Sequence, residues 1–391
     1  MAKMRVSALA KELGKESKDV VAFFAEKGIE KKPQSSLEED QVQEYKDFVL
    51  KAQKLYAELG YTAYIEMFTD TDAANTNLYQ AYEELDKEGK LILRTQGAWG
   101  INNSERSMED AEKAVRLKNE SKGGMFEITE MKFFMDGVVE SGGAFMSEPY
   151  GDDVNNFGMD RWPGEEGLKK LTELIVMANE NGMDAHFHAM GDAAVTKTLD
   201  AIEAARMKVI NPEVKNVITH LEVVKDSDAP RFRELNVLAA ANMAWGSKVS
   251  ADRYDKMEVK RLGEERAVNA YPYKKLVDAG AVTSFATDYP PGSIAYPFAG
   301  YSVGISRSIL GFPETVRNEA LSLTREEGLI ALTKNGAVQM RQDKFRGTIE
   351  TGKVADFIIV DTNLLTCLSE KTGLTTNLKT FVNGEQVFEY K

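Results

Sequence analysis

Seven short apolar runs separated by helical patterns constrain this chain more than any other feature of its sequence. The runs cover residues 62–67, 91–95, 128–135, 184–187, 216–219, 237–241 and 282–286. Helical patterns such as residues 167–181 and 193–205 lie between most of them. Strands that alternate with helices favour a parallel sheet, and this many units favour an α/β fold of the (β/α) TIM-like barrel type. An open doubly wound sheet is the alternative, although no glycine-rich phosphate turn follows the first run.

The count of strands is one short of a closed eight-stranded barrel. The two ends of the chain follow other patterns. Residues 1–48 contain short amphipathic helical patterns and predict a small helical module. Residues 346–391 predict a small β unit, because Asn383-Gly384 between two apolar runs is a hairpin signal. The barrel is then expected over residues 49–345.

Composition excludes several classes of protein. The chain has 49 Lys and Arg against 62 Asp and Glu, a net charge of −13, which makes nucleic acid an unlikely partner because phosphate binding needs clustered positive charge. Its one cysteine, Cys367, excludes an internal disulfide. No apolar run approaches the roughly eighteen residues of a membrane span, and the first residues are not an apolar leader. We expect a cytoplasmic protein with a small-molecule substrate and no membrane partner.

Two of the three histidines, His186 and His188, stand two residues apart in one predicted strand. Residues i and i+2 of a strand point to the same face, so both imidazoles face one space. One short segment can thereby present two nitrogen ligands to a divalent metal. A half-buried, hydrogen-bonded histidine pair is the alternative interpretation.

Polar residues also end other apolar runs. In a barrel, the C-terminal ends of the strands converge on one mouth, where Lys132, His188, His220 and Asp288 would meet. Each has a structural alternative: Lys132 could point outward, His220 could be a satisfied core histidine, and Asp288 could form a turn. Their joint occurrence at successive strand ends favours a metal site. Histidine and carboxylate are donors that zinc prefers in catalytic sites.

Six stretches of the chain resemble one family in order and spacing. They are Met-Lys-Phe-Phe-Met-Asp-Gly at 131–137, Ser-Glu-Pro-Tyr at 147–150, His-Ala-Met-Gly-Asp at 188–192, Thr-His-Leu-Glu at 219–222, Ala-Thr-Asp-Tyr-Pro at 286–290 and Gly-Thr-Ile-Glu-Thr-Gly-Lys-Val-Ala-Asp at 347–356. Residues from about 50 to 391 thereby resemble the C-terminal part of the metal-dependent amidohydrolase superfamily. The resemblance is to the branch that includes N-substituted formamide deformylases.

The resemblance implies roles for four residues. Lys132 matches a lysine that becomes carboxylated and bridges two metals, and His188 and His220 match metal ligands. Asp288 matches an aspartate that binds the other metal and serves as general base. The implied activity is hydrolysis of amide-type, non-peptide carbon–nitrogen bonds by metal-activated water, with zinc as the expected divalent metal. His186 receives no role from the resemblance and remains an additional candidate ligand.

The chain also departs from that family. The superfamily carries a His-x-His pair at the end of its first strand, whereas no histidine precedes His186 here. The resemblance thus implies that the strand missing from the predicted barrel is strand one. The resemblance therefore implies at most one tightly bound metal and impaired activity, unless a homodimer completes the barrel. Candidate substrate contacts are Arg94, Trp99, Trp245 and Arg307, each of which could equally pack or lie at the surface.

Residues 1–48 carry a second resemblance. The stretches at 4–14, 18–30 and 35–42 resemble the N-terminal domain of bacterial translation initiation factor two. No phosphate-binding loop of the kind found in GTPases occurs in the chain. The alternative function is therefore a catalytically inactive fusion or fragment whose N-terminal module binds the translation machinery.

Overall fold

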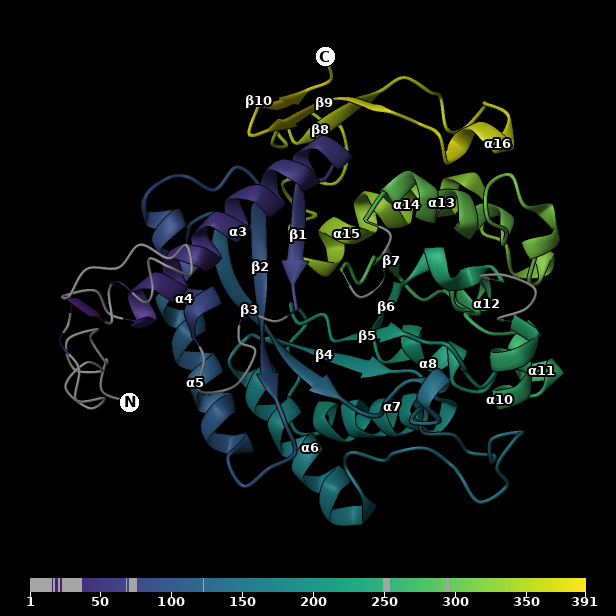
Figure 1. Cartoon of the computed structure of the whole chain (residues 1–391). Coiled ribbons are helices and arrows are strands. Elements are labelled where there is room, and N and C mark those ends of the chain that lie inside the picture. Colours follow the sequence, from purple (N-terminus) through teal and green to yellow (C-terminus); the bar gives the residue numbers. More distant parts are fainter. Residues whose placement is uncertain are drawn as a thin grey trace.

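A curled sheet of seven parallel strands forms the body of the chain (Figure 1). The structure is a computed structural model that describes residues 37–391 except 68, 70–75, 122, 249–253, 291, 293 and 294, together with 16, 18, 19 and 22. The strands are β1 Ala63–Glu66, β2 Arg94–Ile101, β3 Phe126–Phe134, β4 Asp184–Ala189, β5 Val217–His220, β6 Leu238–Ala241 and β7 Thr283–Phe285. Their spatial order follows the sequence, which confirms the predicted TIM-like barrel that is one strand short.

Every predicted run contains a strand, but β2 differs most from its prediction. The apolar run predicted a strand at residues 91–95, whereas β2 begins at Arg94 and continues to Ile101. Its second half is interrupted by glycines and so shows no apolar run. Gly97 is required by close packing, since a Cβ there would meet Thr69 Cγ2 at 2.6 Å and Ile128 Cδ1 at 2.7 Å.

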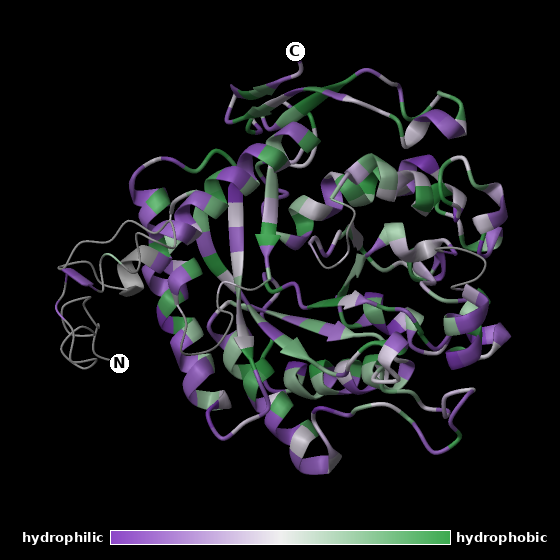
Figure 2. Cartoon of the chain, in the orientation of Figure 1, coloured by the Kyte–Doolittle hydropathy of each residue, from purple (hydrophilic) through white to green (hydrophobic). Residues whose placement is uncertain are grey.

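Helices surround the sheet on its outer side (Figure 1). They are α3 Leu37–Leu59, α4 Asn77–Lys87, α5 Ser107–Glu120, α6 Gly164–Glu180, α7 Asp192–Arg206, α8 Ala229–Glu234, α10 Lys260–Leu262, α11 Glu264–Val268, α12 Tyr273–Asp278, α13 Pro297–Ser306, α14 Arg325–Leu332 and α15 Lys334–Gln339. One further helix, α16 Ser369–Thr372, belongs to the C-terminal region (Figure 1). Figure 2 shows purple and green alternating along these helices, as expected of amphipathic segments. On α6, for example, Leu171, Leu174, Ile175 and Ala178 are buried at helical spacing. No described helix is long and apolar enough to cross a membrane.

The sheet does not close on itself within the described residues. There, β1 pairs only with β2, and β7 pairs only with β6. The open side of β7 is partly covered by α15, because Asn335 Nδ2 donates a hydrogen bond to the Thr283 carbonyl at 2.8 Å. Residues of β1, β7 and α15 line one cavity of about 950 Å³.

A three-stranded antiparallel sheet follows the barrel, as the sequence predicted. It consists of β8 Phe357–Val360, β9 Asn377–Val382 and β10 Glu385–Glu389. The hairpin between β9 and β10 turns at Asn383 and Gly384, whose φ angles of 55° and 80° are those of a tight hairpin turn. This sheet lies against the end of α3, where Thr380 Oγ1 donates to the Ala57 carbonyl at 2.6 Å.

The predicted division at residues 1–48, 49–345 and 346–391 stays a prediction. The helix α3 runs from Leu37 to Leu59 and passes through the first of these boundaries without interruption. Apart from residues 16, 18, 19 and 22, the helical patterns predicted before residue 37 lie outside the described residues.

A buried carboxylate joins the C-terminal sheet to the barrel. The side chain of Asp356 is 2% exposed and lies 3.1 Å from Arg94 Nε at the start of β2. It also lies 3.5 Å from Arg346 Nη1 and accepts the Asn383 backbone N–H at 2.7 Å. Two guanidinium groups therefore depend on one carboxylate for their charge compensation.

We expect Asp356→Ala to lower the free energy of unfolding by about 3–5 kcal/mol, because it leaves buried positive charge uncompensated. Urea denaturation followed by circular dichroism measures this change. The control is Lys344→Ala, which removes an ion pair to Glu213 whose side chains are 77% and 69% exposed. An Asp356→Ala transition that coincides with that of the control would contradict the assigned role.

Candidate metal centre

The register of three neighbouring strands brings the predicted site residues together. Phe134 of β3 pairs with His188 of β4, and Ala189 of β4 pairs with His220 of β5. His220 pairs with Ala189 and not with His188, so its ring reaches the site through the left-handed backbone that ends β5, where φ is 77°. The rings of His188 and His220 lie edge to face, with centroids 4.5 Å apart. The five predicted residues all line the same cavity, namely Lys132, His186, His188, His220 and Asp288. The structure thus gathers the predicted set at one place.

His188 is held by the turn that follows β3. Its Nε2 donates to the Gly137 carbonyl at 3.1 Å and lies 3.4 Å from Asp136 Oδ1. Within the described part of the chain, its Nδ1 makes no hydrogen bond. An imidazole held by one nitrogen and free at the other is the usual state of a metal ligand.

Asp136 organises the backbone around His188. Its buried carboxylate accepts N–H groups from Phe145 at 2.9 Å, Met190 at 3.1 Å and Gly191 at 2.8 Å. Burial raises the pKa of Asp136 to about 7, whereas these N–H donors lower it. The carboxylate therefore fixes the turn after β4 and the position of His188 together.

His220 is fixed in the same manner by other residues. Its Nδ1 donates to Asn242 Oδ1 at 3.1 Å, and its ring stacks on Trp245 with an interplanar angle of 5°. Its Nε2 has no hydrogen-bond partner among the described residues. His220 and Leu221 have φ angles of 77° and 57°, which are strained for side chains of this size. The hydroxyl of Tyr273 donates to the His220 carbonyl at 2.8 Å and helps to hold this conformation.

Lys132 carries a positive charge that acts on both imidazoles. It is 3% exposed, and its ammonium group makes no hydrogen bond or ion pair with the described residues. Burial lowers the pKa of Lys132 to about 8, against the opposing charges of Glu130 and Asp288. Burial and the charge of Lys132 also lower the pKa of His188 to about 3. Burial moves the pKa of His220 in the same direction, helped by His188 and Lys132, so both imidazoles are neutral as metal binding requires.

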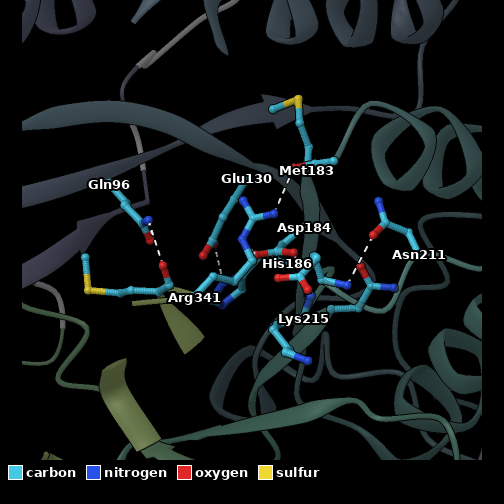
Figure 3. Close-up of polar contacts among 12 residues, drawn as sticks. Gln96, Glu130, Met183, Asp184, His186, Asn211, Lys215 and Arg341 are labelled. Carbon is cyan, nitrogen blue, oxygen red and sulfur yellow. Dashed lines mark hydrogen bonds and ion pairs between the residues drawn. The ribbon is translucent and has the colours of Figure 1, made fainter. Parts of the chain in front are cut away.

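His186 lies beside Lys132 in the register and belongs to a deeper polar cluster (Figure 3). Its Nδ1 donates to Glu130 Oε2 at 2.8 Å. Its Nε2 and Glu130 Oε1 are buried with no hydrogen-bond partner in the described part of the chain. Nearby, Arg341 Nε lies 3.2 Å from Asp184 Oδ2. His186 is therefore fixed by Glu130, which lies on β3 itself, whereas His188 is held by the turn after β3 and His220 by Asn242 after β6.

Asp288 follows β7 on the other side of the cavity. It is half-buried and has a φ of 55°, a left-handed conformation that aspartate tolerates better than most residues. Burial raises its pKa, and the charge of Lys132 opposes this shift. A carboxylate with a raised pKa accepts a proton more readily than an ordinary surface carboxylate does.

The four predicted substrate contacts fall in different places. Trp245 lines the cavity and covers His220. Arg94 pairs with Asp356, and Trp99 is fully buried in the core. Arg307 is buried and donates to the backbone carbonyls of residues 270 and 271. Only Trp245 is positioned to touch a ligand in this cavity.

Three residues that hold the site were not singled out from the sequence. They are Glu130, Asp136 and Asn242. Asn242 directly follows β6 and could have been found by the same rule of polar residues at strand ends, although an amide is not a usual metal ligand. Asp136 stands at the end of a matched stretch, where its buried contacts carry no sequence signal. Glu130 is a charged residue within an apolar strand, which is itself a sign of a partner.

The donor set fits a metal ion only in part. Among the described residues, no three His, Cys, Asp or Glu side chains are close enough to hold one. The ligands that remain are the two imidazoles of His188 and His220, together with Lys132 as a third donor. The set therefore fits a single divalent ion, provided that Lys132 contributes.

Comparisons with known proteins agree with this fold. The sequence profile of the amidohydrolase family matches residues 13–388. The chain is 25% identical over 363 residues to Protein LONG AFTER FAR-RED 3 of Arabidopsis thaliana, covering 90% of this chain and 59% of that protein. It is 26% identical over 318 residues to N-substituted formamide deformylase of Arthrobacter pascens, covering 79% and 55%. This chain thus spans less than two thirds of either relative.

Solved structures show the same relation. An uncharacterized metal-dependent hydrolase from Pyrococcus furiosus superimposes with a TM-score of 0.66 at 27% identity, covering 83% of this chain and 61% of that one. A metal-dependent hydrolase from Pyrococcus horikoshii superimposes with a TM-score of 0.67 at 24% identity, covering 84% and 62%. Because the family profile spans nearly the whole sequence, this chain belongs to the amidohydrolase family.

Proposed function

We propose that this chain is a metal-dependent hydrolase of amide-type, non-peptide carbon–nitrogen bonds. The observation that carries the proposal is the pair of His188 and His220, whose rings lie edge to face with centroids 4.5 Å apart beside the buried Lys132. Each imidazole has one nitrogen bound to a protein oxygen and leaves the other for a ligand. The formamide deformylase and the metal-dependent hydrolases among the relatives support the same reaction class.

His188, His220 and Lys132 would hold the ion, and their nitrogen-rich set favours zinc. A divalent ion supplies Lewis acidity toward a carbonyl and makes water more acidic. With a pKa of about 8, Lys132 has a neutral fraction near neutral pH. A neutral amine adds to CO₂ with formation of an N–C bond and release of one proton. The resulting carbamate would offer an anionic oxygen, which partly offsets the absence of any histidine before His186.

Asp288 is placed to move the proton in this reaction. The oxygen of water forms a bond to the carbonyl carbon, and the bond from that carbon to nitrogen breaks. Asp288 takes a proton from the attacking water and delivers it to the leaving nitrogen, so that one amide and one water give one acid and one amine. Its raised pKa suits a group that must first accept and then donate a proton.

The alternative function, an inactive chain whose N-terminal module binds the translation machinery, receives no support from the comparisons. The amidohydrolase profile begins at residue 13, within the segment predicted as a separate module.

Metal content tests the proposed ligands directly. We expect the purified chain, equilibrated with Zn²⁺ and freed of excess, to retain about one ion per chain by elemental analysis. His188→Ala and His220→Ala should each lose it, because one imidazole and a lysine are too few donors. Asp192→Asn is the control, since Asp192 accepts the Ser147 N–H at 2.9 Å outside the ligand set. Retention of the ion by both histidine variants would disprove the assignment.

The role of Asp288 separates metal binding from chemistry. Asp288→Asn should keep the ion but lower kcat for amide hydrolysis by roughly 10²- to 10⁴-fold, the usual contribution of a general acid–base group. Steady-state kinetics with elemental analysis of the same sample give both quantities. If kcat were unchanged while the ion was retained, another group would have to carry the proton.

A further inference from the structure

The cavity that contains the candidate metal centre extends well beyond it. The same cavity is lined by residues from β7, α13, α14 and the C-terminal region that follows the barrel. Its apolar part, which we call the seam cavity, is lined by Phe285, Phe298, Leu329, Leu332, Ile358 and Leu364. In a closed (β/α) barrel the interior is filled by side chains in layers, whereas among the described residues β1 and β7 are each paired on one side only and both line the cavity. A volume of about 950 Å³ is near the upper end of the range for small-molecule sites.

The cavity reaches the surface at a rim of mixed polarity. Ile349 and Leu365 are 94% and 49% exposed there, and Thr348 and Asn363 line the cavity beside them. The walls of the seam cavity belong to a packed cluster that includes Phe298, Leu332 and Leu364. An apolar section that shares one cavity with the polar groups of the candidate metal centre suits a ligand with one polar and one apolar end.

A polypeptide strand is the other occupant to consider, since it could pair with the open edge of β7. The edge of β7 that faces β6 is already paired, and the pairing extends to the residues that flank β7, since Ala239 N donates to Val282 O and Ala286 N donates to Ala241 O. The intervening Thr283 carbonyl, which faces the open side, already accepts Asn335 Nδ2 at 2.8 Å. An added strand would have to displace this bond and the packed α15, so the observations favour a small ligand.

From these observations we infer that the substrate is an amide with a large apolar substituent, either a long alkyl or an arylalkyl chain. The amide lies between His188, His220 and Asp288, and the apolar chain fills the seam cavity. This inference rests on the proposed function for the amide end. The assignment of the apolar end rests only on the residues that line the seam cavity.

Ligand affinity along a homologous series tests the inference without turnover. The probes are N-alkylacetamides from butyl to decyl, and binding to the metal-free full chain is measured by isothermal titration calorimetry. We expect the dissociation constant to fall by about threefold to fourfold per added methylene, as burial of one methylene in an apolar site supplies. An affinity that does not change along the series would overturn the inference.

Substitutions on helix α14 test whether the apolar end of the probe binds in the seam cavity. Leu332→Trp should weaken binding of the decyl probe by on the order of tenfold or more, because the indole takes the space of several methylenes. It should leave binding of the butyl probe unchanged. Ile330→Trp is the matched control, since Ile330 also lies on α14 but is 42% exposed and does not line the cavity. Leu364→Trp is a second variant in which a larger side chain occupies the seam cavity. Thermal unfolding verifies that each variant is folded.

The outcomes separate the two proposals. Chain-length-dependent binding in a protein that holds no metal would refute the proposed function and leave the seam cavity assigned. A metal-binding, hydrolytic protein with equal affinity for all probes would refute the seam cavity alone. If light scattering shows a dimer that must dissociate before the decyl probe binds, a second copy fills the seam, and the inference is wrong.

Discussion

Parallel pairing of β3, β4 and β5 is the constraint on which the rest of this structure depends. In a parallel sheet the carboxyl ends of neighbouring strands lie side by side, so residues distant in sequence meet at one edge. The register places His188 opposite Phe134, and His220 opposite Ala189. Paired residues share a face of the sheet, so His188 lies on the face of Thr219, and His220 reaches the site because its backbone is left-handed at the end of β5. The candidate metal centre therefore depends on the register of β3 and β4 and on the turn that ends β5.

Buried polar contacts then convert that register into a site with fixed geometry. Asp136 accepts three backbone N–H groups and lies beside His188, and Asn242 orients His220. The left-handed backbone at His220 and Leu221 is unfavourable and persists because hydrogen bonds from Tyr273 and to Ala189 hold it. Such local strain is common where side chains must be aimed at a ligand. It is consistent with a site organised before a ligand arrives.

A strand or turn was predictable where the local sequence carries a physical signal for it. Strand β6 is a continuous apolar run, as expected of a parallel strand that is buried on both faces, and it was predictable from the sequence. The same holds for the hairpin at Asn383 and Gly384, whose turn chemistry is local. The extent of β2 was not predictable, since Gly97 serves a close contact with residues that are distant in sequence.

Candidate site residues were predictable where the residue type itself indicates a chemical role. His188, His220, Lys132 and Asp288 stood at strand ends and were identified before the structure. The residues that hold them were not, because Asp136 and Asn242 act through contacts that only the folded chain creates. Arg94, Trp99 and Arg307 were considered as ligand contacts from their residue types alone. Their partners are instead a carboxylate, the core and backbone carbonyls.

An anomalous difference map from crystals of the zinc-loaded chain, recorded at the zinc absorption edge, tests the central claim most directly. The account predicts one peak in the space between the His188 and His220 imidazoles, next to Lys132. It further predicts that the contacts of His188 with Gly137 and of His220 with Asn242 are kept. A peak at another place would contradict the account. So would the absence of a peak in crystals of protein that holds one zinc ion per chain in solution.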